Sequence, residues 1–346
     1  MRIVKQYYID IAEDRAKDPL ALLIKLVLWF FSLGYEGVVV IRNFLFDKGY
    51  LKSAQVAVPV ISLGNLTWGG SFKTSLAIFI ARRLTGLRGA VVTRGYGKDE
   101  VDMLTASLTS SGTKVLVGKN RAEVISSAVT EIDYAVLDDG FQHRQLKRDC
   151  DILMINADLG LKAQNLIPCG SLREPTAAAF KRVQAVVFTN AVIPPQPLVG
   201  QIAKLNPTIV YFAAKYQPRA FVGMYGETYD LDKIAKDGAV ACFCAIAYPA
   251  GFLKTLKSIG VFPRFTFIYP DHYFIDESKF RDIESRCMAE SVKTLIITAK
   301  DRSRFVYPTL LKILVLDVDV IMDRPDEFVS FIRGVIDTKK NSSNNA

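Results

Sequence analysis

A glycine-rich loop between an apolar run and a helical pattern could hold a chain of phosphates. The apolar run covers residues 58–64, the loop covers residues 65–72, and Lys73-Thr74 opens the helical pattern. Backbone N–H groups of such a loop can close around a polyphosphate, and the positive N-terminal end of the helix adds to the attraction. In this arrangement Lys73 neutralises the outer phosphates and Thr74 offers its hydroxyl to Mg²⁺.

The loop matches the phosphate-loop pattern G-x-x-x-x-G-K-[ST] only in part. Thr67 stands where the first glycine is expected and Phe72 where the glycine before the lysine is expected, whereas Gly69 and Gly70 are present. If position 72 needs a positive φ, Phe72 adds about 1–3 kcal/mol of strain. A structural strand-to-helix turn is therefore an open alternative. The candidate phosphate-binding residues are Thr67, Trp68, Gly69, Gly70, Ser71, Phe72, Lys73 and Thr74.

A pair of aspartates forms the second candidate cluster. Asp138 and Asp139 follow an apolar run and precede Gln142 and His143. In phosphoryl transfer a carboxylate at the end of a strand holds or orients Mg²⁺, because charged oxygen is the ligand that this ion prefers. A surface turn is the alternative for the aspartates alone, but the strand pattern before them and the Gln-His after them weaken it.

Two further clusters carry groups that could move a proton. Asp99 follows the motif Arg94-Gly-Tyr-Gly97, and His272, one of two histidines, lies in Tyr269-Pro-Asp-His-Tyr273. A kinase needs a carboxylate near the γ-phosphate to take the proton of the acceptor hydroxyl, and Asp99 is a candidate. A carboxylate paired with His272 would be a base with a tuned pKa. The alternative for Asp99 is a solvated acidic residue.

The overall charge favours an anionic partner. The net charge is +9 and the pI about 9.2, which suits nucleic acid, a phosphorylated metabolite or an anionic membrane. A nucleic-acid binder is expected to show interleaved aromatic residues or a reading helix, and neither appears. Arg94, Arg121 and Arg173 are better suited to the phosphate groups of a small or lipid substrate. A solvated basic face is the alternative.

The cysteines indicate a reducing setting. Five are present, an odd number at irregular spacing, so we predict that they are reduced and mostly buried in a cytoplasmic protein. A zinc site is not expected, because both histidines lie far in sequence from Cys242 and Cys244.

Short apolar runs separated by helical lengths predict the elements that position these clusters. Such runs indicate a parallel sheet buried on both faces, where ligands collect at the carboxyl ends of the strands. A proline cluster over residues 193–219 predicts a linker before a second α/β unit. The predicted strands cover residues 90–93, 114–117, 134–137, 152–155, 240–244, 264–268, 294–298 and 313–316.

An apolar helix is predicted near the N-terminus. Asp18-Pro19 is a good helix opening, and Gly34 is expected to end or bend the helix. A helix that ends at Gly34 is shorter than the roughly 20 residues needed to span a bilayer. A longer helix would include Lys25 and Glu36, and each charged side chain would cost about 2.5–3.5 kcal/mol near the centre of the bilayer. An interfacial or partly inserted helix is therefore expected. A buried helix packed on the domain is the alternative, and a signal peptide fits poorly.

Together these motifs resemble the tetraacyldisaccharide 4′-kinase family of lipid A biosynthesis, from the apolar helix to about Val320. The string Asp-Asp-Gly-Phe-Gln-His is the most specific among them. The motifs that carry the resemblance are Val60-Ile-Ser-Leu-Gly-Asn-Leu-Thr67, Arg94-Gly-Tyr-Gly97, Leu137-Asp-Asp-Gly-Phe-Gln-His-Arg144 with Arg148-Asp149, Leu172-Arg-Glu-Pro175, Pro270-Asp-His-Tyr273 and Thr298-Ala-Lys-Asp301.

The resemblance implies an ATP- and Mg²⁺-dependent kinase at the cytoplasmic face of the inner membrane. It would phosphorylate the 4′-hydroxyl of a tetraacyldisaccharide 1-phosphate and form lipid IV-A. The implied fold class is α/β, a P-loop NTPase-like parallel sheet with helices on both faces, plus a smaller C-terminal α/β domain and an N-terminal membrane-associated helix. The expected domains are a membrane-associated segment (1–45), a P-loop kinase domain (46–205), a C-terminal α/β domain (206–337) and a disordered tail (338–346).

The resemblance also implies roles for single residues. Asp99 paired with His272 would accept the proton, Asp138 and Asp139 would play the Walker-B part, and Glu174 would support the metal shell together with Thr74 and Asp139. Gln142 and His143 would line the substrate site, with Arg94, Arg121 and Arg173.

Two departures from the family pattern leave an alternative function open. Phe72 replaces a glycine of the phosphate loop, and the segment between Gly97 and Asp99 is shorter than usual. A weakened homologue that binds nucleotide or lipid without efficient turnover is therefore the alternative. A P-loop GTPase or metal-insertion factor is disfavoured, because Thr298-Ala-Lys-Asp301 does not have the spacing expected for a guanine-reading motif.

Overall fold

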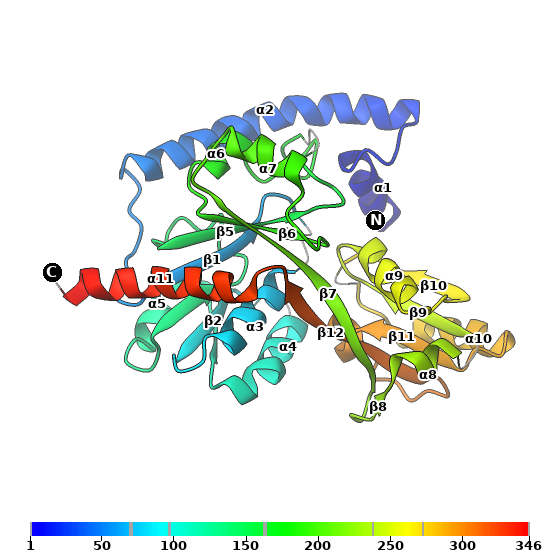
Figure 1. The fold of residues 1–346 in the computed structure, drawn as a ribbon. Helices are drawn as coiled ribbons and strands as arrows, with labels where there is room; N and C mark the ends of the chain where they lie inside the picture. Colours follow the sequence, from blue (N-terminus) through cyan, green and yellow to red (C-terminus); the bar gives the residue numbers. More distant parts are fainter. Residues whose placement is uncertain are drawn as a thin grey trace. The chain divides into compact units, whose positions relative to one another are not determined.

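The chain folds into two compact units. The structure, a computed structural model, describes residues 2–68, 72–95, 98–161, 165–236, 239–271 and 273–344. The first unit contains Met1–Tyr96, Leu104–Ala214 and Met322–Ala346, and the second contains Gly97–Met103 and Lys215–Ile321 (Figure 1). Strand β7 (Val210–Gly223) leads from the first unit into the second, and strand β12 (Lys312–Met322) leads back.

A parallel sheet forms the centre of the first unit. The order of its strands is β7-β6-β5-β1-β4-β2-β3, and every recorded pairing among them is parallel. Strands β1, β2, β4 and β6 are buried along their whole length, which explains their continuous apolar sequences. The four strands predicted here are confirmed. The bounds are β1 (Val60–Asn65), β2 (Gly89–Thr93), β3 (Lys114–Val117), β4 (Tyr134–Leu137), β5 (Cys150–Asn156) and β6 (Ala185–Thr189).

Helices pack on both faces of this sheet. Tyr211 stacks on Phe188 with ring centroids 6.2 Å apart, while its neighbour Phe212 meets Phe328 at 5.0 Å on the other face. Consecutive strand residues point to opposite faces, so these two contacts identify the two sides. The helices on this sheet are α3 (Lys73–Arg83), α5 (Arg121–Ser127), α6 (Thr176–Phe180), α7 (Gln196–Ala203) and α11 (Pro325–Asn344). Helix α4 (Lys98–Leu108) belongs to the second unit as far as Met103 and to the first unit from Leu104, and the short 3-10 helix η1 (Thr109–Ser111) follows it.

The C-terminal helix α11 departs from the predicted domain plan. Its Phe328 packs against Phe79 of α3, with ring centroids 6.3 Å apart, and Lys339 Nζ lies 3.2 Å from Asp149 Oδ1. These contacts return Met322–Ala346 to the first unit, so the predicted boundary at residue 337 is wrong. The predicted disordered tail is also wrong as far as Asn344, because residues 338–344 continue α11.

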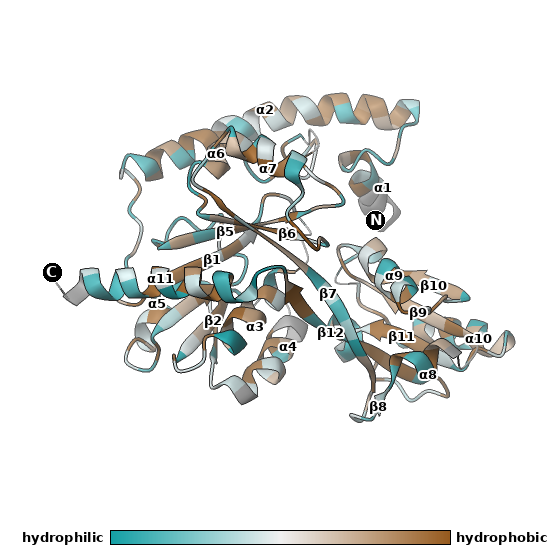
Figure 2. Cartoon of the chain, viewed as in Figure 1, coloured by the Kyte–Doolittle hydropathy of each residue, from teal (hydrophilic) through white to brown (hydrophobic). Residues whose placement is uncertain are grey.

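Two helices precede the sheet. Helix α1 covers Arg2–Ala12, and α2 covers Pro19–Asp47, with Asp18 Oδ1 accepting a hydrogen bond from Ala21 N as the predicted N-cap. Gly34 was expected to end or bend the helix; it does not end it, since α2 is 29 residues long in all and runs on to Asp47. A glycine costs a helix only about 1 kcal/mol, and contacts at the far end of α2 outweigh that cost. Hydrophobic residues recur along α2 in Figure 2.

The second unit has its own parallel sheet, in the order β10-β9-β11-β12. Its core includes Phe243, which meets Phe305 edge to face with ring centroids 4.9 Å apart. The four strands predicted for this part are confirmed, and all five cysteines of the chain are buried and free, as predicted. The elements are β8 (Thr228–Tyr229), α8 (Leu231–Lys236), β9 (Val240–Cys244), α9 (Pro249–Ser258), β10 (Phe265–Ile268), α10 (Glu277–Ala289), β11 (Thr294–Thr298) and the 3-10 helix η2 (Ala299–Arg304).

Candidate active site

The first two candidate clusters meet at one edge of the first sheet. Strands β1 and β4 are parallel neighbours, so the loops after them lie together at the carboxyl edge. Thr74 Oγ1 donates a hydrogen bond to Asp138 Oδ2 at 2.8 Å, and Lys73 Nζ lies 3.5 Å from Asp139 Oδ1. The two residues expected to serve phosphates and Mg²⁺ are therefore paired with the two expected Walker-B carboxylates.

Phe72 has the backbone that a glycine would adopt more easily. Its φ is 86°, in the left-handed region, so the strain of about 1–3 kcal/mol expected for this case applies. Its side chain is only 4% exposed, and burying an aromatic side chain stabilises a protein by roughly 1.5–3 kcal/mol. Burial of the ring therefore offsets the strain of the backbone.

The part of the loop before Phe72 is only partly described. Trp68 N donates to Ser171 O at 3.0 Å, and Thr67 pairs with Leu172. The candidates Gly69, Gly70 and Ser71 lie outside the described residues, so their phosphate contacts stay predictions.

Two arginines hold the aspartate loop. Arg173 Nη1 donates to both carboxylate oxygens of Asp139, at 3.0 and 3.1 Å, and Arg121 donates to the backbone oxygens of Asp138 and Asp139 at 3.1 Å each. Burial tends to raise the pKa of Asp139, but Lys73 and Arg173 outweigh this effect and hold it below its usual range. Asp139 is thus an anion held between cations at neutral pH.

The five predicted substrate-binding residues line one pocket. Its volume is about 320 Å³, and Asp139 is also part of its wall. The wall carries three guanidinium groups beside a single carboxylate, which suits a ligand with phosphate groups. The five residues are Arg94, Arg121, Gln142, His143 and Arg173.

His143 is expected to be neutral at physiological pH. Burial, and after it the positive charges of Arg121, Arg148 and Arg94, lower its pKa from 6.5 to about 4. His143 therefore binds a proton near pH 6.5 in the unfolded chain, but only near pH 4 in the folded protein. We expect stability to fall as the pH drops from 6.5 toward 4, and His143→Asn to flatten that fall. Urea unfolding between pH 4.5 and 7.5 measures this fall in stability. An NMR pKa near 6.5 for His143 in the folded protein would contradict the expectation.

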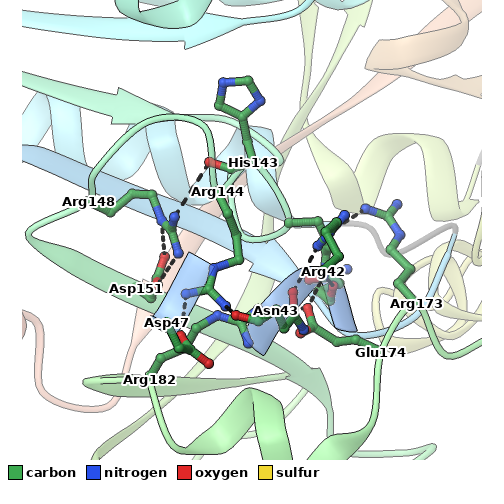
Figure 3. Close-up of polar contacts among 12 residues, drawn as sticks. Arg42, Asn43, Asp47, His143, Arg144, Arg148, Asp151, Arg173, Glu174 and Arg182 are labelled. Carbon is green, nitrogen blue, oxygen red and sulfur yellow. Dashed lines mark hydrogen bonds and ion pairs between the residues drawn. The ribbon is translucent and has the colours of Figure 1, made fainter. Parts of the chain in front are cut away.

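A polar layer lies between this pocket and helix α2 (Figure 3). Glu174 is fully buried, and its Oε1 accepts hydrogen bonds from Arg182 Nη2 at 2.7 Å and Gln142 Nε2 at 3.1 Å. Its Oε2 accepts from Asn43 Nδ2 of α2 at 3.4 Å. The predicted support of the metal shell by Glu174 stays a prediction. These hydrogen bonds allow Glu174 to act on the site indirectly, through Gln142.

The expected proton acceptor and its partner fall outside the described residues. His272 is not described, and Asp99 belongs to the first turn of α4 without a described side chain. Beside His272 in sequence, Asp271 Oδ1 accepts from Lys300 Nζ at 3.0 Å, which joins two motifs of the second unit. The roles of Asp99 and His272 stay predictions.

The motif Thr298-Ala-Lys-Asp301 has a structural role in the second unit. Asp301 is fully buried, accepts a hydrogen bond from Thr298 Oγ1 at 2.6 Å and forms an ion pair with Arg304. Burial raises the pKa of Asp301, against the opposing effects of Thr298 and Arg304. A carboxylate enclosed in this way has no access to a nucleotide base, which is a further argument against a guanine-reading motif.

The side chains at the sheet edge fit Mg²⁺. Within the described ranges, no group of three or more His, Cys, Asp or Glu side chains is placed to hold a metal alone. Mg²⁺ usually takes only one or two carboxylates and completes its shell with water and substrate phosphates. The hydroxyl of Thr74 beside the carboxylates of Asp138 and Asp139 supplies hard oxygen donors of that kind.

Residues from α2 and from the start of the loop after α6 were not predicted as part of this region. Asn43 and Arg182 reach Glu174, and Tyr35 OH donates to Arg173 O at 2.9 Å. Ser32, Val39 and Asn43 share the buried face of α2. A polar residue on an otherwise apolar helix is normally hydrogen-bonded when buried, and this was the available signal for Asn43.

Comparisons with known proteins match one family over nearly the whole chain. The profile of the tetraacyldisaccharide-1-P 4′-kinase family matches residues 24–337. A tetraacyldisaccharide 4′-kinase of Syntrophus aciditrophicus is 32% identical over 327 residues, covering 84% of this chain and 86% of the relative. One of Aquifex aeolicus is 32% identical over 291 residues, covering 77% and 87%. The crystal structure of the Aquifex aeolicus LpxK in complex with ATP superposes with a TM-score of 0.68 at 26% identity, over 90% of this chain and 99% of that one.

Proposed function

The chain belongs to the tetraacyldisaccharide-1-P 4′-kinase family, and from this premise we propose that it transfers the γ-phosphoryl group of ATP to the 4′-hydroxyl of a tetraacyldisaccharide 1-phosphate. The reaction forms lipid IV-A in lipid A biosynthesis. The observation that carries the proposal is the pairing of Thr74 with Asp138, and of Lys73 with Asp139, beside a pocket lined by arginines.

Each described group has a part in phosphoryl transfer. Lys73 would neutralise the outer phosphates of ATP. Thr74, Asp138 and Asp139 would hold Mg²⁺, which when bound would supply further positive charge to the transferring group. Arg173 and Arg121 keep the aspartate loop in place, and the guanidinium groups of the pocket wall attract phosphate oxygens. Asp99 paired with His272 takes the proton of the 4′-hydroxyl.

The direct test is phosphorylation of a tetraacyldisaccharide 1-phosphate by the purified full-length protein with Mg-ATP. We expect the product to carry the new phosphate at the 4′ position. Asp99→Ala should lower the rate about 10²- to 10⁴-fold. Transfer at another hydroxyl would refute the acceptor site, and full activity of Asp99→Ala would refute the base.

Phe72 decides between an active kinase and a weakened homologue. Because its ring is buried, replacing it should remove more packing energy, about 3–5 kcal/mol, than the strain of about 1–3 kcal/mol that it relieves. We expect Phe72→Gly to lower Tm without raising kcat. Wild-type protein that binds ATP tightly but does not turn over, together with a rise in kcat for Phe72→Gly, would establish the weakened homologue instead.

The apolar face of α2 attaches the first unit to a membrane surface. Leu23, Phe30 and Phe31 are 59–65% exposed, which contradicts the alternative of a buried core helix. The helix is long enough to cross a bilayer, but Ser32, Tyr35 and Asn43 bind loops of the first unit. Those contacts hold one face of the helix on the protein, so its exposed apolar face enters the acyl boundary at the cytoplasmic face of the inner membrane.

Charged residues on this face should release the protein from lipid. Burying one large apolar side chain is worth about 1.5–3 kcal/mol, so Leu23→Asp with Phe30→Asp should weaken binding by at least about 100-fold. Sedimentation with phosphatidylethanolamine–phosphatidylglycerol vesicles measures the loss. Tyr225→Asp is the control, because Tyr225 is 95% exposed in the second unit. Equal binding of the two variants would contradict an attachment through α2.

A further inference from the structure

Helix α2 reaches the aspartate loop through a continuous chain of hydrogen bonds. Asn43 bonds to Glu174, Glu174 to Gln142, Gln142 to Arg173 and Arg173 to Asp139. We propose that Asn43 is a positioning residue for phosphoryl transfer, which acts through Glu174 and Gln142 on the Arg173–Asp139 pair. The proposal rests on the proposed function and adds a contribution of the apolar helix to it.

The orientation of Asn43 follows from its neighbours. Arg42 Nη2 donates to Asn43 Oδ1 at 3.2 Å, which directs the amide nitrogen toward Glu174 Oε2. The backbone oxygen of Asn43 also accepts from Arg144 Nη1 at 3.2 Å, so this turn of α2 is tied to the loop after β4. Figure 3 shows Asn43 between these groups.

Glu174 depends on this bond because it is a fully buried carboxylate. Arg182 neutralises its charge at Oε1 and also lies over the ring of Phe141, with 3.9 Å from guanidinium carbon to centroid. Among the described residues, Asn43 is the hydrogen-bond donor that reaches Oε2. A buried carboxylate oxygen that loses its donor is costly, so without Asn43 the carboxylate should turn away from its present position.

The position of Glu174 in turn decides which way the amide of Gln142 faces. Gln142 Nε2 donates to Glu174 Oε1 and to Asn65 O, both at 3.1 Å. With its nitrogen engaged on two acceptors, the amide presents its oxygen to Arg173 Nη1 at 3.1 Å. The same Nη1 contacts both oxygens of Asp139, so a displaced Gln142 loosens the Arg173–Asp139 pair.

The test exchanges the donor and the acceptor. Asn43→Asp places two carboxylates face to face, and Glu174→Gln leaves Arg182 without its anion. Each single variant should lower kcat about 10-fold with the KM for ATP nearly unchanged. In the double variant the new amide can donate to the new carboxylate, and the total charge is unchanged. It should recover much of the lost kcat.

Ser32→Ala is the matched control. Ser32 lies on the same buried face of α2, and its hydroxyl donates to Leu166 O at 2.8 Å and accepts from Cys169 N at 3.0 Å. Ser32→Ala should lower the free energy of unfolding by about as much as the Asn43 variant does, and should keep the wild-type kcat. A double variant no better than the product of the two singles, or an equal kcat loss for Ser32→Ala, would overturn the proposal.

A second measurement separates this proposal from the function itself. The guanidinium N–H resonances of Arg173, followed by ¹⁵N NMR in the full-length protein, need no turnover. They should shift in Asn43→Asp and return toward the wild-type positions in the double variant, even if the wild-type protein phosphorylated a different acceptor. Unchanged Arg173 resonances in all variants would refute the positioning role, whereas absent transfer by wild type would refute only the proposed acceptor.

Discussion

Asp138→Asn should lower kcat/KM by about 10³-fold while the protein stays folded. The amide keeps the shape of the side chain and can still accept from Thr74 Oγ1, but it removes a charged oxygen from the proposed Mg²⁺ site. Loss of a single preorganised group that stabilises the transition state typically costs 10²–10³ in rate, and loss of metal affinity adds to this. The signature should be a higher Mg²⁺ concentration at half-maximal rate, measured by steady-state kinetics from 0.1 to 50 mM Mg²⁺.

Asp149→Asn provides the matched control for the loss of a carboxylate. Asp149 Oδ2 accepts a hydrogen bond from Val60 N at 2.9 Å, and Asp149 Oδ1 faces Lys339. Asp149 lies just before β5 and beside the start of β1, not at the carboxyl edge of the sheet. This variant should lower Tm and leave the Mg²⁺ dependence of the rate unchanged. If Asp138→Asn kept the wild-type Mg²⁺ dependence, Asp138 would not belong to the metal site.

Arg173→Ala should produce a loss of about 10³-fold in kcat/KM for a different reason. Arginines that stabilise a transferring phosphoryl group are worth about 10³–10⁵ in rate. Arg173 also helps to hold the pKa of Asp139 low, so its removal should raise that pKa. In the proposed mechanism the ionised form of Asp139 is the active one, so the acid limb of the rate profile should move to higher pH. A profile of kcat/KM from pH 5 to 9 measures both effects.

Arg173→Lys distinguishes charge from geometry. The lysine keeps a positive charge near Asp139 but cannot reproduce the planar guanidinium that faces Asp139 and Gln142 together. Compared with Arg173→Ala, Arg173→Lys should therefore return the acid limb of the rate profile most of the way to its wild-type pH. It should restore only part of the lost kcat/KM. Arg88→Ala, which removes the exposed ion pair with Asp133, controls for the loss of one positive charge and should match wild type. A wild-type acid limb in Arg173→Ala would contradict the coupling to Asp139.

Local sequence patterns predicted the strands and the clusters that follow them. Parallel strands buried on both faces are short apolar runs, and the groups that bind phosphate and metal must lie just after such runs, at the carboxyl edge of the sheet. Strand-end spacing therefore placed Lys73, Thr74, Asp138 and Asp139 at one edge of the sheet, while the family resemblance supplied their roles. Arg94 and Arg121 also lie within a few residues of a strand end, whereas Arg173 lies in the long connection between β5 and β6 and was assigned from the resemblance.

The sequence by itself thus determined the parallel α/β sheet and the family. Only the tertiary structure decided that α2 continues past Gly34, that Phe72 turns its ring into the core, that α11 returns to the first unit, and that Asn43 meets Glu174 across 131 positions of sequence. The physical reason is that strand and loop patterns arise from neighbouring residues. A buried hydrogen bond or a packed ring instead depends on which distant surface the folded chain brings against it.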